Sequence, residues 1–221
     1  MIDKRELLLA CRYLARSGLG DSIFGHISAI DRESQTILIK PTTVGFDEIK
    51  EEEFVTIDLD GKKKSGRDSP PGESAIHTEI YRANKEVGSI VHVHAFNAAV
   101  LGAMTKTVEA YTQNSVIFSG ARIYDDARLI TEAQTARKLV RVLGNNPGTI
   151  LRSHGIVCVG PRIQEACIRA AWLEEAATAQ NLSFSSKSRP MNLAERKSLG
   201  QVVARKERYD RIWSYIERSV S

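Results

Sequence analysis

Gly88-Ser-Ile-Val-His-Val-His-Ala95 is a short run rich in Ile and Val that opens on a glycine, and it predicts a β-strand. Successive side chains of a strand point to opposite faces, so His92 and His94 share one face while Val91 and Val93 turn to the other. Neutral imidazoles are common ligands of zinc and related cations, so the pair suits a divalent metal. By itself His-x-His is a weak signal. Two half-buried histidines hydrogen-bonded to the backbone are the alternative.

Two further segments strengthen the metal interpretation. Upstream, Pro70-Pro-Gly-Glu73 precedes residues 74–83, which have helical spacing, so Glu73 lies at the first turn of a helix. Downstream, residues 149–160 read as strand, turn and strand, with His154 at the turn. Three histidines and one carboxylate form a four-ligand set in which the carboxylate can give way to a substrate. Catalytic zinc sites keep such an open position, whereas structural sites usually close with cysteine.

These segments resemble the signature of the class II aldolase/adducin family, and the resemblance runs from about residue 3 to about residue 181. It rests on Pro71-Gly-Glu73, Val91-His-Val-His94, Leu151-Arg-Ser-His-Gly155-Ile-Val-Cys-Val-Gly160, Leu19-Gly-Asp-Ser-Ile-Phe-Gly-His-Ile-Ser28 and Val55-Thr-Ile-Asp-Leu-Asp-Gly61. The family includes L-fuculose-1-phosphate aldolase, L-ribulose-5-phosphate 4-epimerase, several decarboxylases and the non-enzymatic adducin heads. The resemblance implies a three-layer α/β/α domain. Hairpin-spaced strands among the helices predict a central sheet that is mixed or mainly antiparallel.

The resemblance also implies a divalent cation held by His92, His94 and His154, with Glu73 as fourth ligand or as the catalytic acid/base. Zinc is the preferred ion, and manganese, cobalt and iron are alternatives because nitrogen and oxygen ligands select weakly among them. Such a cation stabilises the enolate or enediolate of a small carbonyl substrate, an intermediate common to aldol cleavage and decarboxylation. The ligand set therefore does not separate these reactions. Family members take a further acid/base from a tyrosine or aspartate, for which the candidates here are Tyr111, Tyr124, Tyr209 and Tyr215.

The segments that correspond to the phosphate loops of the sugar-phosphate members differ from the family pattern. Those members typically carry Ser-Gly-Asn-Ile-Ser, Thr-Pro-Ser-Gly and Pro-Ser-Ser-Glu. Here the stretches are Phe24-Gly-His-Ile-Ser28, Lys40-Pro-Thr-Thr43 and Pro70-Pro-Gly-Glu73. Hydroxyls and close-approach glycines are what a phosphate cradle needs, so these departures predict a substrate other than a sugar phosphate. The candidate substrate-binding residues are Gly25, His26, Thr42, Thr43 and Gly72.

A carboxylate is the expected alternative to phosphate, met by His26, Lys40 or Arg122, although His26 can equally be a hydrogen-bonded loop residue. Three functions follow. The first is a metal-dependent carbon–carbon lyase acting on a hydroxy-carbonyl compound or oxo acid. The second is a sugar-phosphate aldolase or epimerase with an altered pocket. The third is an adducin-like binding module without chemistry, which has no need of all four ligands.

Composition predicts an ordinary soluble protein with one domain, 1–221, in which 182–221 form a connector and a C-terminal helix. The chain is 42% hydrophobic and 26% charged with a net charge of +4, so nucleic acid is not an expected partner. No apolar run approaches 18 residues, and the first residues lack the apolar core of a secretory signal, so neither a membrane span nor export is expected. Cys11, Cys158 and Cys167 lie within apolar patterns and predict reduced thiols in a cytoplasmic protein.

Periodicity and turn signals predict the remaining elements. Helices are expected at 3–17, 95–104, 130–143, 164–181 and 192–218, strands at 24–30, 36–40 and 54–59, strand pieces at 115–124, and a polar loop at 62–69. The last helix is basic and amphipathic, with Ile212, Trp213 and Ile216 on one face. Such a face needs a surface to cover, which predicts a homo-oligomer, and the family resemblance implies a tetramer with the site near a subunit boundary.

Overall fold

A computed structural model describes residues 2–220, and Met1 and Ser221 lie outside the described part. Its centre is β5 (Ser89–Val93), all of whose residues are buried. The seven-stranded sheet has the order β4-β3-β2-β1-β5-β7-β6, and neighbouring strands pair antiparallel. The other strands are β1 (His26–Asp31), β2 (Thr36–Ile39), β3 (Val55–Asp58), β4 (Lys63–Ser65), β6 (Gly148–Leu151) and β7 (Gly155–Gly160).

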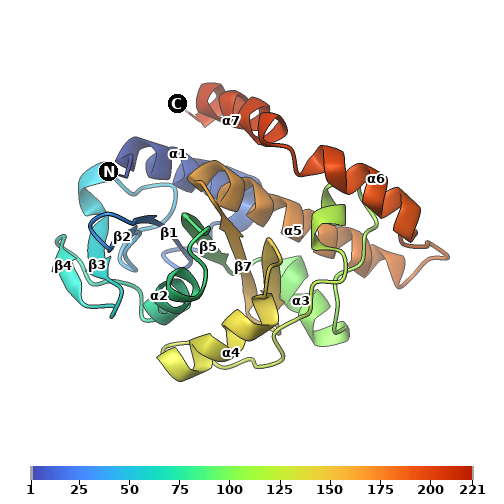
Figure 1. The fold of residues 1–221 in the computed structure, drawn as a ribbon, viewed down its shortest axis with the longest axis horizontal. Helices are drawn as coiled ribbons and strands as arrows, with labels where there is room; N and C mark the ends of the chain where they lie inside the picture. The colour runs from blue at the N-terminus through green and yellow to red at the C-terminus, as the bar shows by residue number, and fades with distance from the viewer. Residues whose placement is uncertain (1, 221) are drawn as a thin grey trace.

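Helices cover both faces of the sheet (Figure 1). One layer contains α1 (Lys4–Leu14), α3 (Phe96–Met104), α5 (Ile163–Ser183), α6 (Leu193–Val203) and α7 (Lys206–Val220), and the other contains α2 (Ser74–Ala83) and α4 (Ala133–Leu143). Val91 and Val93 belong to the core under the first layer, whereas Ile90 belongs to the core under the second. The predicted three-layer α/β/α architecture with a mainly antiparallel sheet is confirmed.

Strand register places the histidine-bearing segments side by side. His26 of β1 pairs with His92 of β5, which pairs in turn with Val157 of β7. The turn between β6 and β7 contains His154. The three histidines therefore lie at the same end of the sheet. Because Ile90 and His92 share a face, the His92 side chain is directed to the layer in which α2 begins.

Three segments differ from the sequence prediction. Residues 63–65 of the expected polar loop pair with β3 as the edge strand β4, whose exposed residues give no hydrophobic alternation to detect. Residues 115–124 contain no strand. Asn114–Phe118 form a 3₁₀ helix, Arg122 makes an isolated β-bridge with Thr107, and Tyr124 makes one with Leu151. A short apolar run does not distinguish these states.

The predicted helix 192–218 is two helices, α6 and α7, separated at Ala204–Arg205. The apolar face of α7 packs against α1 and α5 of the same chain, leaving Trp213 only 5% and Ile216 0% exposed. The prediction that this face needs a partner subunit was therefore wrong. The three cysteines are buried and free, as expected. No helix within the described residues has the length and apolar character needed to cross a membrane.

Candidate metal centre

Four predicted side chains converge at the end of β5. Glu73 precedes the first residue of α2, His92 lies in β5, His94 follows it, and His154 lies in the β6–β7 turn. One ligand atom from each lies within 4.8 Å of the others. The Nε2 atoms of His92 and His154 are each 3.5 Å from Glu73 Oε2. Ligands about 2.1 Å from a tetrahedral cation stand about 3.4 Å apart, so this spacing suits one ion.

The backbone explains how His154 reaches the group. Gly155 opens β7 against Val93, and a Cβ atom added to it would lie 2.2 Å from the Val93 carbonyl oxygen. Any larger residue would push the hairpin away from β5. Ser153 has a φ of 57°, which makes the turn before His154 tight. The close approach of β7 to β5 therefore depends on a glycine immediately after the histidine.

Hydrogen bonds to neighbouring residues orient the imidazole rings of His92 and His94. His92 Nδ1–H donates to the Ile156 carbonyl oxygen over 2.9 Å, and His94 Nδ1–H donates to Asp21 Oδ2 over 2.8 Å. In neutral imidazole this leaves an unprotonated Nε2 atom on each ring. Metal-binding histidines are held in the same way by a carbonyl or carboxylate.

Buried nitrogen atoms without partners support the same assignment. Among the described residues, none is hydrogen-bonded to His92 Nε2 or to either ring nitrogen of His154. Leaving buried polar atoms unpaired is costly, and a cation would satisfy the Nε2 atoms. Burial lowers the pKa of His92 despite its neighbour Glu73, which favours the neutral imidazole that a metal requires. The residues present fit a divalent cation.

Glu73 is a fixed and ionised carboxylate. Its Oε1 atom accepts a hydrogen bond from the Ile130 amide over 2.7 Å, while Oε2 faces the histidines. Burial raises its pKa, but interactions with His154, His92 and the Ile130 amide outweigh burial and hold the pKa far below its usual range. One oxygen is thus anchored by backbone and the other is available to a cation or a proton.

Two of the predicted substrate residues lie against the centre. The His26 ring centroid is 4.9 Å from that of His92, and the residue is 4% exposed. Gly25 has a φ of 75°, and an added Cβ would lie 2.9 Å from the Phe46 ring. The glycine is therefore required by the backbone, whatever its part in binding.

The other substrate candidates lie on adjoining loops. Lys40 Nζ donates to the carbonyl oxygens of Ile23, Gly25 and Pro41 over 2.9, 3.2 and 3.0 Å, which ties the loop before β1 to the loop after β2. Lys40 is 0% exposed, so its ammonium fastens these loops and does not face a substrate. Thr42 and Thr43 follow directly in this second loop.

Thr42 is half-buried, Thr43 is exposed, and Gly72 is exposed immediately before Glu73. Arg122 is exposed beyond an isolated bridge. No hydrogen bond joins any of these four residues to the four converging residues in the described part of the chain.

The candidate tyrosines are dispersed. Tyr209 packs on Trp172, and its hydroxyl oxygen accepts a hydrogen bond from Arg169 Nε over 3.2 Å. Tyr215 is exposed on α7, and Tyr111 is half-buried. Tyr124 is buried, and its hydroxyl has no hydrogen-bond partner among the described residues.

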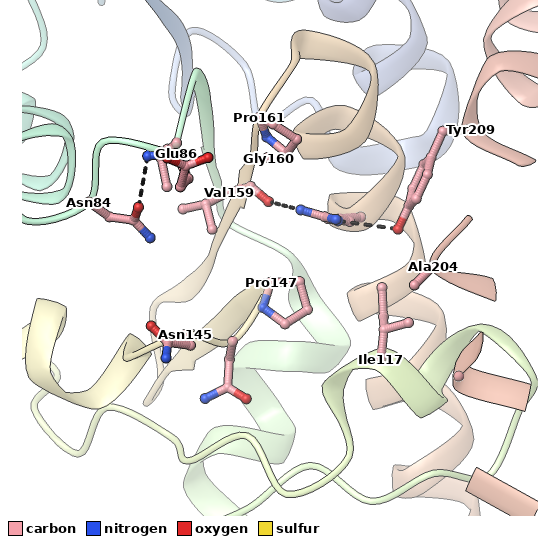
Figure 2. Close-up of a pocket in the computed structure, with 14 residues that line it drawn as sticks. Asn84, Glu86, Ile117, Asn145, Pro147, Val159, Gly160, Pro161, Ala204 and Tyr209 are labelled. Carbon is pink, nitrogen blue, oxygen red and sulfur yellow. Dashed lines mark hydrogen bonds between the residues drawn. The ribbon is translucent and has the colours of Figure 1, made fainter. Parts of the chain in front are cut away.

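A separate cavity of about 400 Å³ lies at the opposite end of β5 and β7, beyond Gly160 (Figure 2). Its lining includes Asn84, Asn145, Pro161 and Tyr209. None of the predicted metal or substrate residues lines it, because the strands separate the two ends. Tyr209 therefore belongs to this cavity and not to the metal centre of its own chain.

Sequence reasoning missed two residues around the centre, Asp21 and His77. His77 is completely buried one turn of α2 beyond Glu73, and its Nε2 lies 2.7 Å from His26 Nδ1. The i, i+4 pair of Glu73 and His77 on a predicted helix was the available signal. Asp21 lies in the quoted segment 19–28, but only the folded chain places it beside His94.

Residues 5–181 match the family described as Class II Aldolase and Adducin N-terminal domain. The chain belongs to this family. The match covers most of the chain and begins and ends close to the limits predicted from the sequence. It confirms the resemblance on which the ligand assignment was based.

Solved structures of the family share the fold. An aldolase II superfamily protein from Pseudomonas syringae aligns with a TM-score of 0.85 and 22% identity over 98% of this chain and 91% of that chain. The L-fuculose 1-phosphate aldolase from Glaciozyma antarctica gives 0.85 and 21% over 97% and 88%. That from Thermus thermophilus gives 0.72 and 19% over 84% and 97%. At this identity the comparison shows the fold and not the substrate.

Proposed function

We propose that this class II aldolase family protein is a divalent-metal-dependent carbon–carbon lyase, with zinc as its ion. It would catalyse aldol cleavage or decarboxylation of a small hydroxy-carbonyl or oxo-acid substrate by stabilising the enolate or enediolate that forms. The observation that carries the proposal is the convergence of Glu73, His92, His94 and His154 with their ligand atoms within 4.8 Å. A binding module without chemistry would have no physical use for buried imidazole nitrogens that lack a hydrogen-bond partner among the described residues.

The protein residues divide the work. A cation bound by the three histidines would supply Lewis-acid stabilisation of negative charge on substrate oxygens. The Ile156 carbonyl and the Asp21 carboxylate hold the His92 and His94 rings in place. Glu73 would accept or return a substrate proton at its Oε2 atom, while the Ile130 amide keeps Oε1 fixed.

The substrate is proposed to carry a carboxylate or a neutral polar group in place of a phosphate. The support is the content of the loops: His26, Thr43 and Pro71-Gly72 stand where the sugar-phosphate members have amide, glycine and hydroxyl groups. The Lys40 ammonium is buried against backbone carbonyl oxygens, so it is not available to bind a substrate phosphate. Gly25, Thr42 and Gly72 remain the backbone and hydroxyl contacts of the proposed pocket.

A homotetramer with the site near a subunit boundary is also proposed, on a surface other than α7. Helix α3 begins two residues after His94 and exposes Phe96, Val100 and Met104 by 75%, 38% and 57%. These residues are spaced by four and form one apolar stripe beside the metal centre. An exposed stripe of this kind suits a second copy of the chain. The three buried reduced thiols suit the proposed cytoplasmic location.

The test is an assay of metal-loaded protein with hydroxy-oxo acids, aromatic and muconic carboxylates, L-fuculose 1-phosphate and L-ribulose 5-phosphate. Release of carbon dioxide identifies a decarboxylase, and release of an aldehyde identifies an aldolase. Efficient turnover of a sugar phosphate alone would contradict the substrate proposal. Metal-loaded protein that turns over nothing, with Glu73→Gln binding the same compounds equally well, would favour the adducin-like module.

A further inference from the structure

A buried chain of hydrogen bonds extends from the metal centre into the second helical layer. His26 Nδ1 lies 2.7 Å from His77 Nε2, and His77 Nδ1 lies 2.6 Å from Ser28 Oγ. Ser28 Oγ lies 2.7 Å from the Tyr81 hydroxyl. Ser28, His77 and Tyr81 are all 0% exposed. None of these four hydrogen-bonded side chains is a candidate metal ligand.

The direction of these hydrogen bonds follows from the Tyr81 end. Among the described residues, Ser28 Oγ is the only side-chain hydrogen-bond partner of the Tyr81 hydroxyl, and the Ile90 amide beside this hydroxyl is a donor that cannot accept the phenolic proton. If Ser28 donated to Tyr81, the phenolic proton would be buried without an acceptor, at a cost of about 1–3 kcal/mol. Tyr81 therefore donates to Ser28.

The single hydroxyl proton of Ser28 then goes to His77 Nδ1. An imidazole that accepts a hydrogen bond at Nδ1 has no proton on that atom, so His77 is neutral, in keeping with its complete burial. Neutral His77 that accepts at Nδ1 carries its proton on Nε2 and donates to His26 Nδ1. His26 must in turn carry its own proton on Nε2.

The Nε2–H group of His26 stands at the end of this series of hydrogen bonds. None of the residues in 2–220 forms a hydrogen bond with it, and its ring packs against that of His92. An N–H donor next to a metal ligand requires an acceptor from outside the chain. A carboxylate or carbonyl oxygen of a substrate accepts such a bond, whereas an ammonium group does not.

We propose that His77, Ser28 and Tyr81 are positioning residues that hold His26 as the Nε2–H tautomer, so that His26 donates a hydrogen bond to an acceptor oxygen of the substrate. The tautomer assignment is independent of the reaction. The contact with substrate rests on the proposed function, and it requires a substrate that places an acceptor oxygen, such as that of a carboxylate or carbonyl group, next to His26.

The decisive experiment is magic-angle-spinning NMR of zinc-loaded protein labelled with ¹⁵N,¹³C-histidine. The chain has only five histidines, so His26 can be assigned by comparison with His26→Gln. We expect a protonated Nε2 and an unprotonated Nδ1 at His26. The opposite tautomer in the wild-type protein would overturn the proposal outright, with no dependence on a variant or on turnover.

A substitution tests the positioning role. Ser28→Ala removes the side-chain donor to His77 Nδ1, so we expect a mixture of His26 tautomers, unchanged zinc content and a fall of about tenfold in kcat/KM. Ser115→Ala is the matched control, because Ser115 is also fully buried and donates to the Thr112 carbonyl away from the site. A wild-type tautomer pattern in folded Ser28→Ala protein would contradict the positioning role.

The substrate contact has its own readout. Lactate, a small hydroxy acid, should shift the His26 Nε2–H resonance when added to the zinc protein. Lactate that binds without moving this resonance would contradict the contact even if the tautomer is as proposed. An absence of turnover with every compound, together with the expected tautomer and shift, would instead refute the lyase function alone.

Discussion

His94 and Asp21, which are 73 residues apart in the chain, are joined by a 2.8 Å hydrogen bond from His94 Nδ1–H to the carboxylate Oδ2. The pair fixes the ring of a candidate metal ligand whose side chain is otherwise partly exposed. Carboxylate partners of this kind orient metal-binding histidines and fix the tautomer whose Nε2 atom faces the cation. We therefore expect Asp21 to contribute to metal affinity without being a ligand.

Replacing this carboxylate should weaken metal binding. We expect Asp21→Asn to lower zinc affinity by about 10–100-fold while the fold is kept, as for other partners of metal-bound histidines. Isothermal titration of chelator-treated protein measures the effect. Asp47→Asn, at an exposed aspartate in a neighbouring loop, is the control and should bind zinc normally. Equal affinities in the two variants would mean that the pair has no part in metal binding.

Glu73 should matter more for turnover than for metal retention. In Glu73→Gln the three histidines remain, so we expect most of the zinc to be kept, whereas loss of the proton-transferring carboxylate should reduce kcat by about 10²–10⁴-fold. The amide oxygen can still accept the Ile130 N–H, so the fold should persist. Metal analysis alongside steady-state kinetics separates the effects. Full activity in this variant would remove Glu73 from the mechanism.

The buried Lys40 ammonium makes the free energy of unfolding change with pH in the alkaline range. Burial lowers the pKa of Lys40 from 10.5 to about 8, against the opposing effect of nearby Cys11 and Glu48. Between these values the unfolded chain binds the proton that the folded chain has released, so the free energy of unfolding rises with pH. From pH 7 to 10 the wild type should gain about 2 kcal/mol relative to Lys40→Met. Parallel urea titrations at the two pH values measure this difference, and a constant difference would contradict it.

The apolar stripe on α3 should mediate self-association. Phe96→Ser combined with Met104→Ser removes its two most exposed side chains and should shift the protein from a tetramer toward smaller species. Light scattering at micromolar concentration reports the mass. Leu182→Ser, at a leucine that is 67% exposed at the end of α5, is the matched control. A wild-type protein that is monomeric at this concentration would refute the tetramer itself.

Much of the centre could be predicted because its residues lie at the ends of regular elements. The period-two alternation of β5 placed His92 and Val91 on opposite faces, and the hairpin pattern placed His154 at a turn. The antiparallel sheet followed from hairpin-spaced strands. These features depend on local spacing and on burial, both of which the sequence records directly.

Other features depend on contacts between distant segments. Asp21 reaches His94, and His77 reaches His26, only after β1, β5 and α2 have packed together. Whether the apolar face of α7 meets its own chain or another could not be read from its periodicity, since both predict the same pattern. The expectation that Lys40 meets a substrate carboxylate failed for a similar reason. Its three carbonyl partners come from turns whose geometry the sequence does not specify.

The most direct test of the central claim is X-ray absorption of zinc-loaded protein, combined with metal analysis of His154→Ala and His77→Ala. The wild type should bind one ion per chain, with nitrogen and oxygen ligands at about 2.0–2.1 Å and no sulfur. His154→Ala should lose that ion, and His77→Ala, which removes a histidine outside the ligand set, should keep it. Zinc bound through sulfur, or retained equally in both variants, would contradict the proposed centre.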